Sequence, residues 1–463
     1  MHTNTSSAPP ESGVGEWRAI GAIVCLALLI GSLGLLPAAH ARPLMQANDG
    51  TTIVYVTNDA RSLRLIQPDG SNDRLLWQVP DGAPGAPIES VMWRPDAKEI
   101  AFTSTHEATC SEYGSDIYLI YPDGSNLRRL TNGPACAALA SYPQGSATVQ
   151  ISNQLANFSE YLVYIEGAPT AKVVTVAPGS TTMVAFPQVA DLGAGVMQTA
   201  VAINGTTRWF DAAVRADVVA GGNVHAGLLT IANSGFGAYG TTHASWSPDG
   251  SRLAYQLGQG ALWQVGRDVP VLGEGGELLD PSVNGSVVGV YPVWSPVGNE
   301  VLYQRSNGSP FTINRATVGG TSAGDAIANV TNTSGIAWIT DGSGMVAADF
   351  ADFLQTRVDL YRMTFADNNI VPLTQVSNPQ GAILPSVSPD SSQIVYAFTE
   401  DIAGNPFTAQ LRIMNMDGSN DHLLTENGRR ASWSRVAPPL TAVPTATPDP
   451  ALKYKAYLPV TIR

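Results

Sequence analysis

The fold of this 463-residue chain is decided by the stretch Ala244-Ser245-Trp246-Ser247-Pro248-Asp249-Gly250-Ser251-Arg252-Leu253-Ala254-Tyr255. It predicts a strand that ends at Trp246, a turn, and a second strand that begins near Arg252. Proline fixes φ near the value that a turn requires, and glycine accepts a positive φ. Ser-Pro-Asp-Gly between apolar runs is therefore typical of a tight turn.

This strand–turn–strand pattern is repeated along the chain. Further copies start near Val91, Val293, Ala337 and Ser386, and a final Ser432-Trp433-Ser434 has no second strand after it. Equivalent positions are separated by 48, 44, 49 and 46 residues in the series Trp246, Trp294, Trp338, Val387 and Trp433. This period, with four strands in each unit, indicates the blades of a β-propeller.

The repeats predict an all-β, six-bladed propeller. Five blades begin near Val91, Ala244, Val293, Ala337 and Ser386. The segment 52–77 has strands b, c and d but lacks strand a, whereas Ser432–Ser434 is a strand a without the other three. Together they complete the sixth blade, a clasp that removes the exposed strand edges of an open array.

Two motifs carry a resemblance to a known family. Trp-Ser-Pro-Asp-Gly with Leu-Ala-Tyr at 246–255, and Asp-Ile-Tyr with Asp-Gly-Ser-Asn and Arg-Leu-Thr at 116–131, resemble the TolB-type propeller repeat, also called the WD40-like or PD40 repeat. The resemblance covers 50–136 and 240–436 and is weakest in the fourth blade, where Val297 replaces the turn aspartate. TolB also has an N-terminal α/β domain, for which this sequence has no room. The resemblance thus implies the repeat architecture and not membership of the TolB–Pal system.

An inserted domain is expected between blades 2 and 3. Trp93 and Trp246 are 153 residues apart, which is one period plus roughly a hundred residues. Residues 142–236 contain seven short apolar or alternating runs, at 147–151, 161–165, 172–176, 182–186, 198–203, 208–210 and 227–231. They predict a small β-sandwich that resembles the Ig-like or transthyretin-like modules of exported proteins.

The two ends of the chain indicate export. Residues 1–41 contain an uncharged apolar run at Ala19–Ala39, followed by Ala39-His40-Ala41, which fits a signal-peptidase site. An uncleaved membrane anchor over 19–39 is the alternative, and either reading exports the rest of the chain to the periplasm, the cell surface or the medium. A Pro/Thr-rich linker at 437–453 and a tail at 454–463 follow the propeller.

Two exported cysteines are expected to form a disulfide. Strands alternate in direction within a blade, so the b–c and d–a connections lie on one face of the ring. Cys110 falls in the b–c loop of blade 2 and Cys136 begins the d–a connection that leads to the insertion. An oxidising compartment permits the bond, which contributes about 3 kcal/mol in the chain-entropy model.

Candidate functional residues are few. The repeat tryptophans are interpreted as packing between blades rather than as a stacking site for a ligand; they are Trp93, Trp246, Trp294, Trp338 and Trp433. His106 and Glu107 in one b–c loop, with Glu400 and Asp401 in another, could meet above the channel as a binding face, although solvated loop residues are the simpler interpretation. No set of residues predicts a catalytic centre, a metal site or a cofactor.

The function expected from these observations is non-catalytic binding. The formal charge of −13 and the lack of a basic stripe argue against nucleic acid. We expect an exported monomeric scaffold that recognises a protein or glycan of the cell envelope through the propeller loops and the inserted sandwich. The alternatives are a glycan-active lyase or hydrolase with a site at the channel mouth, and a structural envelope protein.

Overall fold

The structure is a computed structural model. It describes residues 50–81, 88–107, 110, 115–131, 134–156, 159–193, 198–204, 209–232, 241–257, 261–268, 276–279, 289–305, 312–320, 322, 324–327, 335–350, 357–402 and 408–438. The expected leader at 1–41, the C-terminal tail and most of the linker lie outside these residues. Within the described ranges, no helix has the length and apolar character that a membrane span requires.

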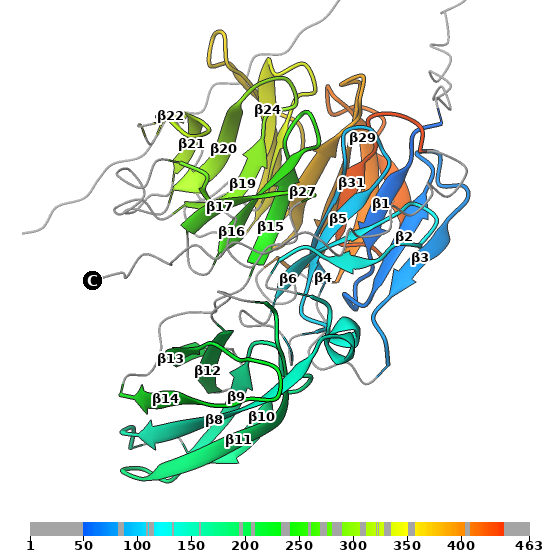
Figure 1. Ribbon diagram of the computed structural model, residues 1–463. Helices are drawn as coiled ribbons and strands as arrows, with labels where there is room; N and C mark the ends of the chain where they lie inside the picture. The colour runs from blue at the N-terminus through cyan, green and yellow to red at the C-terminus, as the bar shows by residue number, and fades with distance from the viewer. Residues whose placement is uncertain are drawn as a thin grey trace, which may run out of the picture. The chain divides into compact units, whose positions relative to one another are not determined.

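The described strands outside residues 144–231 form antiparallel groups of four, which we number blades 1 to 6 (Figure 1). The last two groups are joined into one sheet by a parallel bridge between Val358 and Gly381. Blade 1 contains β31 (Arg430–Trp433), β1 (Ile53–Val56), β2 (Ser62–Ile66) and β3 (Arg74–Gln78). Blade 2 contains β4 (Ile88–Trp93), β5 (Ile100–Ser104), β6 (Asp116–Ile120) and β7 (Arg128–Arg129). Blade 3 contains β15 (Thr241–Trp246), β16 (Arg252–Leu257), β17 (Ala261–Gly266) and β18 (Gly276–Glu277).

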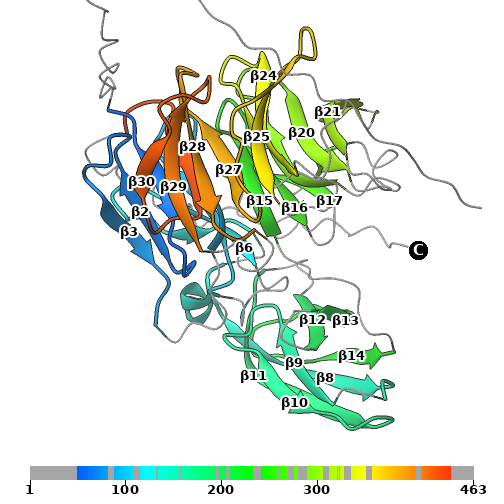
Figure 2. The ribbon, with the colours of Figure 1, turned by 180° about the vertical axis from the view of Figure 1, so that it is seen from behind.

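The later blades follow the same order. Blade 4 contains β19 (Gly289–Trp294), β20 (Glu300–Arg305), β21 (Thr312–Thr317) and β22 (Asp325–Ile327). Blade 5 contains β23 (Ile336–Trp338), β24 (Gly344–Phe350), β25 (Val358–Thr364) and β26 (Ile370–Pro372). Blade 6 contains β27 (Gly381–Val387), β28 (Gln393–Thr399), β29 (Ala409–Asn415) and β30 (His422–Thr425), which lie in this order in Figure 2.

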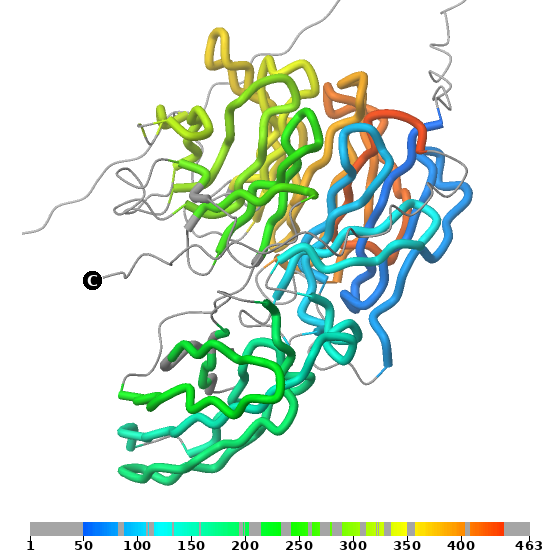
Figure 3. The backbone as a smooth tube through the Cα atoms, viewed as in Figure 1, coloured from blue at the N-terminus to red at the C-terminus, as the bar shows by residue number. Residues whose placement is uncertain are grey.

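The blades form a closed ring. The first strand of each blade contacts the first strand of the next, in the series β31, β4, β15, β19, β23 and β27, and β27 returns to β31. β31 pairs with β1 in the register Ile53↔Trp433 and Val56↔Arg430, so the last described strand completes the first blade (Figure 3). This arrangement confirms the predicted propeller, and the first strands line the inside of the ring.

Apolar layers between consecutive blades make the core. One layer joins Val54 and Leu65 of blade 1 to Trp93 and Phe102 of blade 2, and similar layers lie between the later blades. The repeated Asp-Gly turns fit against these layers closely. Gly418 has φ +82°, and a Cβ there would lie 2.5 Å from the carbonyl oxygen of Leu373 in the preceding blade. Glycine is therefore required by both backbone conformation and space.

Residues 144–231 form two further sheets. One has the order β10 (Lys172–Thr175), β9 (Glu160–Ile165), β12 (Gln198–Asn204) and β13 (Trp209–Ala216); the other has the order β11 (Thr181–Ala190), β8 (Gln144–Asn153) and β14 (Asn223–Ile231). An apolar core that includes Val149, Val163 and Leu229 joins the two sheets. β14 runs parallel to β8, unlike the strands of an all-antiparallel sandwich. The sequence did not predict the 3-10 helix at Cys136–Ser141. That these residues form a separate inserted domain stays a prediction.

Candidate functional site

The repeat tryptophans lie between blades. Trp93, Trp246, Trp294, Trp338 and Trp433 are each at most 6% exposed. The Arg252 guanidinium lies 5.0 Å from the centre of the Trp294 ring, and Arg94 lies 5.9 Å from that of Trp246. Such burial under neighbouring side chains supports the packing interpretation of these residues.

His106, expected on an open binding face, lies among the side chains of blades 1 and 2. Its ring centre is 4.9 Å from that of Trp77 and 4.3 Å from that of Tyr118, and its Nδ1 is 3.0 Å from Ser104 Oγ. Burial, together with the charge of Arg129, lowers the pKa of His106 to about 4. The imidazole is therefore neutral at pH 7 and, at 8% exposure, presents little surface to a partner.

Glu107 lies beside the cysteines. Cys110 and Cys136 are joined by a disulfide, the pairing that the sequence predicts, with their Cα atoms 5.8 Å apart. Glu107 Oε1 accepts a hydrogen bond from the backbone N–H of Cys136 at 3.0 Å, and Oε2 accepts one from the Tyr118 hydroxyl at 3.1 Å. Burial raises the pKa of Glu107. Its carboxylate and the two sulfurs are the one cluster with metal-ligand spacing in the described ranges, but disulfide sulfurs are not thiolate ligands.

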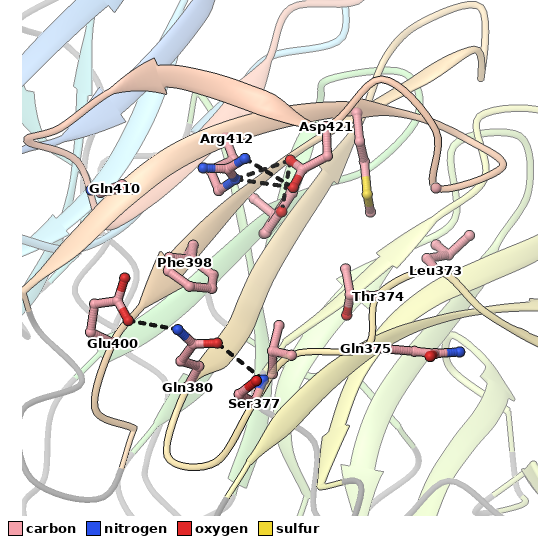
Figure 4. A pocket seen from close by; sticks show the side chains of 14 residues that line it. Leu373, Thr374, Gln375, Ser377, Gln380, Phe398, Glu400, Gln410, Arg412 and Asp421 are labelled. Carbon is pink, nitrogen blue, oxygen red and sulfur yellow. Dashed lines mark hydrogen bonds and ion pairs between the residues drawn. The ribbon is translucent and has the colours of Figure 1, made fainter.

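Glu400 lies at a groove between blades 5 and 6, with a volume of about 500 Å³ (Figure 4). One wall is the segment 373–377, which follows β26. The other wall consists of alternate side chains from β28, the residue just after it, and β29: Tyr396, Phe398, Glu400, Gln410, Arg412 and Met414. Because successive side chains of a strand point to opposite faces, this alternation places all six on the face of blade 6 that is turned toward blade 5.

The two carboxylates of the groove have different partners. Asp421 forms an ion pair with Arg412 at 3.0 Å and accepts a hydrogen bond from the Tyr396 hydroxyl at 2.9 Å. Glu400 is exposed and accepts a hydrogen bond from Nε2 of Gln380 at 2.7 Å, as Figure 4 shows. The charge of Asp421 is therefore balanced within the groove, whereas Glu400 is hydrogen-bonded to a neutral amide. The predicted meeting of Glu400 and Asp401 with His106 and Glu107 above the channel stays a prediction.

The sequence pointed to Glu400 but missed the groove. In blade 1, Asp73 accepts hydrogen bonds from Tyr55 and Arg64, each at 3.0 Å. Blade 6 has the same arrangement in Tyr396, Arg412 and Asp421, so this triad belongs to the repeat and does not distinguish the groove. Differences between the repeats could have indicated the groove. Blade 6 has Phe398 and Gln410 where the matching strands of blade 1 have Thr57 and Ser62.

Comparison with solved structures returns propeller-containing chains of low identity. TolB from Acinetobacter baumannii matches 83% of this chain and 67% of its own, with 16% identity and a TM-score of 0.44. A structure described as TolB from Agrobacterium tumefaciens matches 82% and 90%, with 13% identity and a TM-score of 0.25. A nidogen/laminin complex matches 83% and 98%, with 8% identity and a TM-score of 0.45. No family model and no curated protein matches the chain.

Proposed function

We propose that this protein is a non-catalytic binding scaffold that holds an extended polypeptide segment of an envelope protein in the groove between blades 5 and 6. The observation that carries the proposal is the groove itself, a hollow of about 500 Å³ with polar side chains on both walls. Pockets that accept ligands or anchoring side chains have volumes of ~300–1,000 Å³.

The charges of the groove indicate the chemistry of the partner. Asp421 is neutralised by Arg412, so the carboxylate left for a partner is Glu400. Phe398 stands two residues before Glu400 on the same face, and its ring already has a cation over it, since the Arg412 guanidinium lies 5.8 Å from the ring centre. A lysine or arginine can place its alkyl stem on such a ring and its cation on the carboxylate. The segment is therefore expected to carry a basic residue.

A glycan is the second candidate ligand. Three amide side chains line the groove, those of Gln375, Gln380 and Gln410. Amides donate and accept hydrogen bonds at once, as sugar hydroxyls require. Protease treatment of the bound material distinguishes the two ligand classes.

The proposal includes export. Its support is the apolar run at 19–39 with the cleavage signal that follows, together with the disulfide between Cys110 and Cys136, which needs an oxidising compartment to persist. We propose a monomer that contacts a membrane only through residues 19–39 where these are not removed, and that does not bind nucleic acid.

The test is capture from an envelope extract with the full chain as bait, followed by crosslinking. Glu400→Lys reverses the charge that the partner needs, and Gln410→Trp fills the groove. Glu400→Lys should reduce capture about tenfold, since a charged contact of this kind contributes more than ~1.4 kcal/mol. Gln410→Trp should reduce capture by a similar factor, because its ring occupies the space that the partner needs. Glu426→Lys makes the same charge change at an exposed site of blade 6 outside the groove and should leave capture unchanged.

The same experiment identifies the ligand class. Loss of the captured material after protease treatment of the extract supports a polypeptide, and survival of that material supports a glycan. Equal capture by the wild type, Glu400→Lys and Gln410→Trp would show that the groove is not the binding site.

A further inference from the structure

Four polar side chains stand near the starts of the first strands, on the inside of the ring and apart from the groove. They are Glu89 in β4, His243 in β15, Tyr291 in β19 and Arg430 in β31, and we call them the channel cluster. Three of them precede the repeat tryptophan of their strand by three positions, and Glu89 precedes Trp93 by four. The ring therefore brings together one polar side chain from each of four consecutive blades.

Direct contacts link members of the channel cluster. Arg430 Nη2 lies 3.5 Å from His243 Nε2, and the rings of His243 and Tyr291 meet edge to face with their centres 4.1 Å apart. Arg430 belongs to blade 1 and His243 to blade 3, which are not neighbours in the ring. Side chains from these two blades can meet only in the space that the ring encloses.

The backbone of two members is held in an unfavourable conformation. His243 and Tyr291 have φ values of 54° and 56°, in the left-handed region that side chains with a Cβ disfavour. Both stand at β-bulges, where the pairing register of their strand shifts, and a bulge re-aims the side chain it carries. Leu384 of blade 6 has the same bulge, so the bulge belongs to the repeat, and blade 5 has Gly335 there. Aromatic rings at this position are particular to blades 3 and 4.

The charges of the channel cluster are not balanced by ion pairs. Within the part of the chain that the structure describes, no carboxylate lies at ion-pair distance from Arg430, although burial lowers the pKa of its guanidinium. Glu89 Oε2 is buried without a hydrogen-bond partner, and burial raises the pKa of Glu89. Both residues keep partial solvent exposure, so solvent reaches the cluster. A guanidinium that is largely but not fully shielded from water is stabilised when an anion comes within ion-pair distance.

We propose that the channel cluster binds the carboxylate of a small organic anion, with the Arg430 guanidinium as its principal partner and His243 and Tyr291 beside it. A guanidinium presents parallel N–H groups that match a carboxylate in a bidentate pair. Glu89 places a carboxyl group beside this guanidinium, and it repels a singly charged carboxylate less than it would a doubly charged phosphate. This site shares no residue with the groove, so the inference stands or fails separately from the proposed function.

The experiment is saturation-transfer NMR on the methyl protons of acetate and lactate, with the full-chain protein at constant ionic strength. Saturable transfer is expected for the wild type. Arg430→Gln should weaken binding about tenfold or more. Glu89→Gln removes a neighbouring negative charge and should tighten binding. Arg64→Gln, in the same blade but paired with Asp73 away from the cluster, is the matched control and should bind as the wild type does.

Arg430→Gln and Glu89→Gln are expected to change the affinity for acetate in opposite directions. A folding defect cannot explain both changes, because a damaged ring cannot bind more tightly. Displacement of acetate by an equal concentration of chloride or inorganic phosphate would overturn the assignment to a carboxylate. Absence of saturable transfer in the wild type, or equal affinities in the wild type, Arg430→Gln and Glu89→Gln, would overturn the site.

Discussion

The two ends of the first strands differ in role. One end packs the blades against one another, and the other end presents polar side chains inside the ring. At the turn end stand the repeat tryptophans, which are buried and recur in every blade except blade 6, where Val387 takes their place. At the loop end stand Glu89, His243, Tyr291 and Arg430, which differ from blade to blade; the last three occupy the same position in their strands, and Glu89 lies one residue earlier. The residue that recurs from blade to blade thus packs the ring, and the residues that vary between blades supply the polar groups.

Hydrogen bonds between blades reinforce the turn end. The backbone N–H of Trp294 donates to Ser245 Oγ at 2.8 Å, that of Trp93 to Ser432 Oγ at 3.0 Å, and that of Trp433 to Ser386 Oγ at 3.1 Å. Each serine stands directly before the repeat position of one blade and serves the tryptophan of the next. These bonds join blade 1 to blade 2, blade 3 to blade 4, and blade 6 to blade 1.

Ionisable groups respond differently at the two ends. At the turn end, hydrogen bonds from Ser247 and Ser251 lower the pKa of Asp249 to about 2. In the turns between third and fourth strands, one serine each, Ser125 and Ser419, lowers the pKa values of Asp123 and Asp417. On the loop side, burial is the largest cause, and it lowers the pKa of His106 and raises that of Glu89. The turn aspartates are therefore stabilised as charged groups, and the loop-side groups are stabilised in their neutral forms.

The largest effect is expected from removing a repeat tryptophan. Trp294→Ala should lower the free energy of unfolding by about 3–5 kcal/mol, because a fully packed aromatic side chain leaves a cavity between blades. Chemical denaturation of the full chain measures the change. Val297→Ala, at an exposed site of the same turn, is the control and should change stability by less than ~0.5 kcal/mol. Similar values for the two variants would contradict the packing role.

A pH-dependent effect of at most about 3 kcal/mol is expected from His106, the bound set by the difference between its pKa in the unfolded and folded states. The folded-state pKa of about 4 lies below the unfolded value of 6.5, so the unfolded chain binds the proton first. The contribution to stability is complete above pH 6.5 and is lost as the pH falls toward 4. His106→Phe keeps the ring contacts and should remove this dependence. Parallel stability curves for the two proteins between pH 4 and 7 would refute the assignment.

A smaller effect is expected from the serine hydrogen bonds. Ser245→Ala leaves the buried backbone N–H of Trp294 without its acceptor and should cost about 1–2 kcal/mol. Ser251→Ala, on the exposed turn of the same blade, serves as the comparison and should cost less. Denaturant midpoints of the two variants measure the difference. An unchanged midpoint for Ser245→Ala would mean that these bonds do not hold the blades together.

The smallest effect on stability is expected at the loop end. His243→Gly relieves a left-handed backbone while losing the ring contact with Tyr291, so the free energy of unfolding should change by less than about 1 kcal/mol. The same variant should weaken acetate binding. A large loss of stability would make His243 a packing residue, like the tryptophans at the other end of the strand.

The sequence determined the local parts of this protein. Trp246, the Pro-Asp-Gly turn and the period of the repeat predict blades because turn geometry and strand alternation depend on neighbouring residues. The closure of the ring could be predicted by counting strands, because residues 52–77 lack a first strand and residues 432–434 supply it. The cysteine pair could be proposed because both residues belong to connections on one side of a single blade.

Only the tertiary structure decided the two candidate sites. Arg430 and His243 are 187 residues apart and meet because the ring closes between them. The groove at Glu400 depends on how the segment after β26 lies against the face of blade 6. Sequence patterns report the environment of a residue along its own strand, whereas these contacts are set by long-range closure, to which no local signal corresponds.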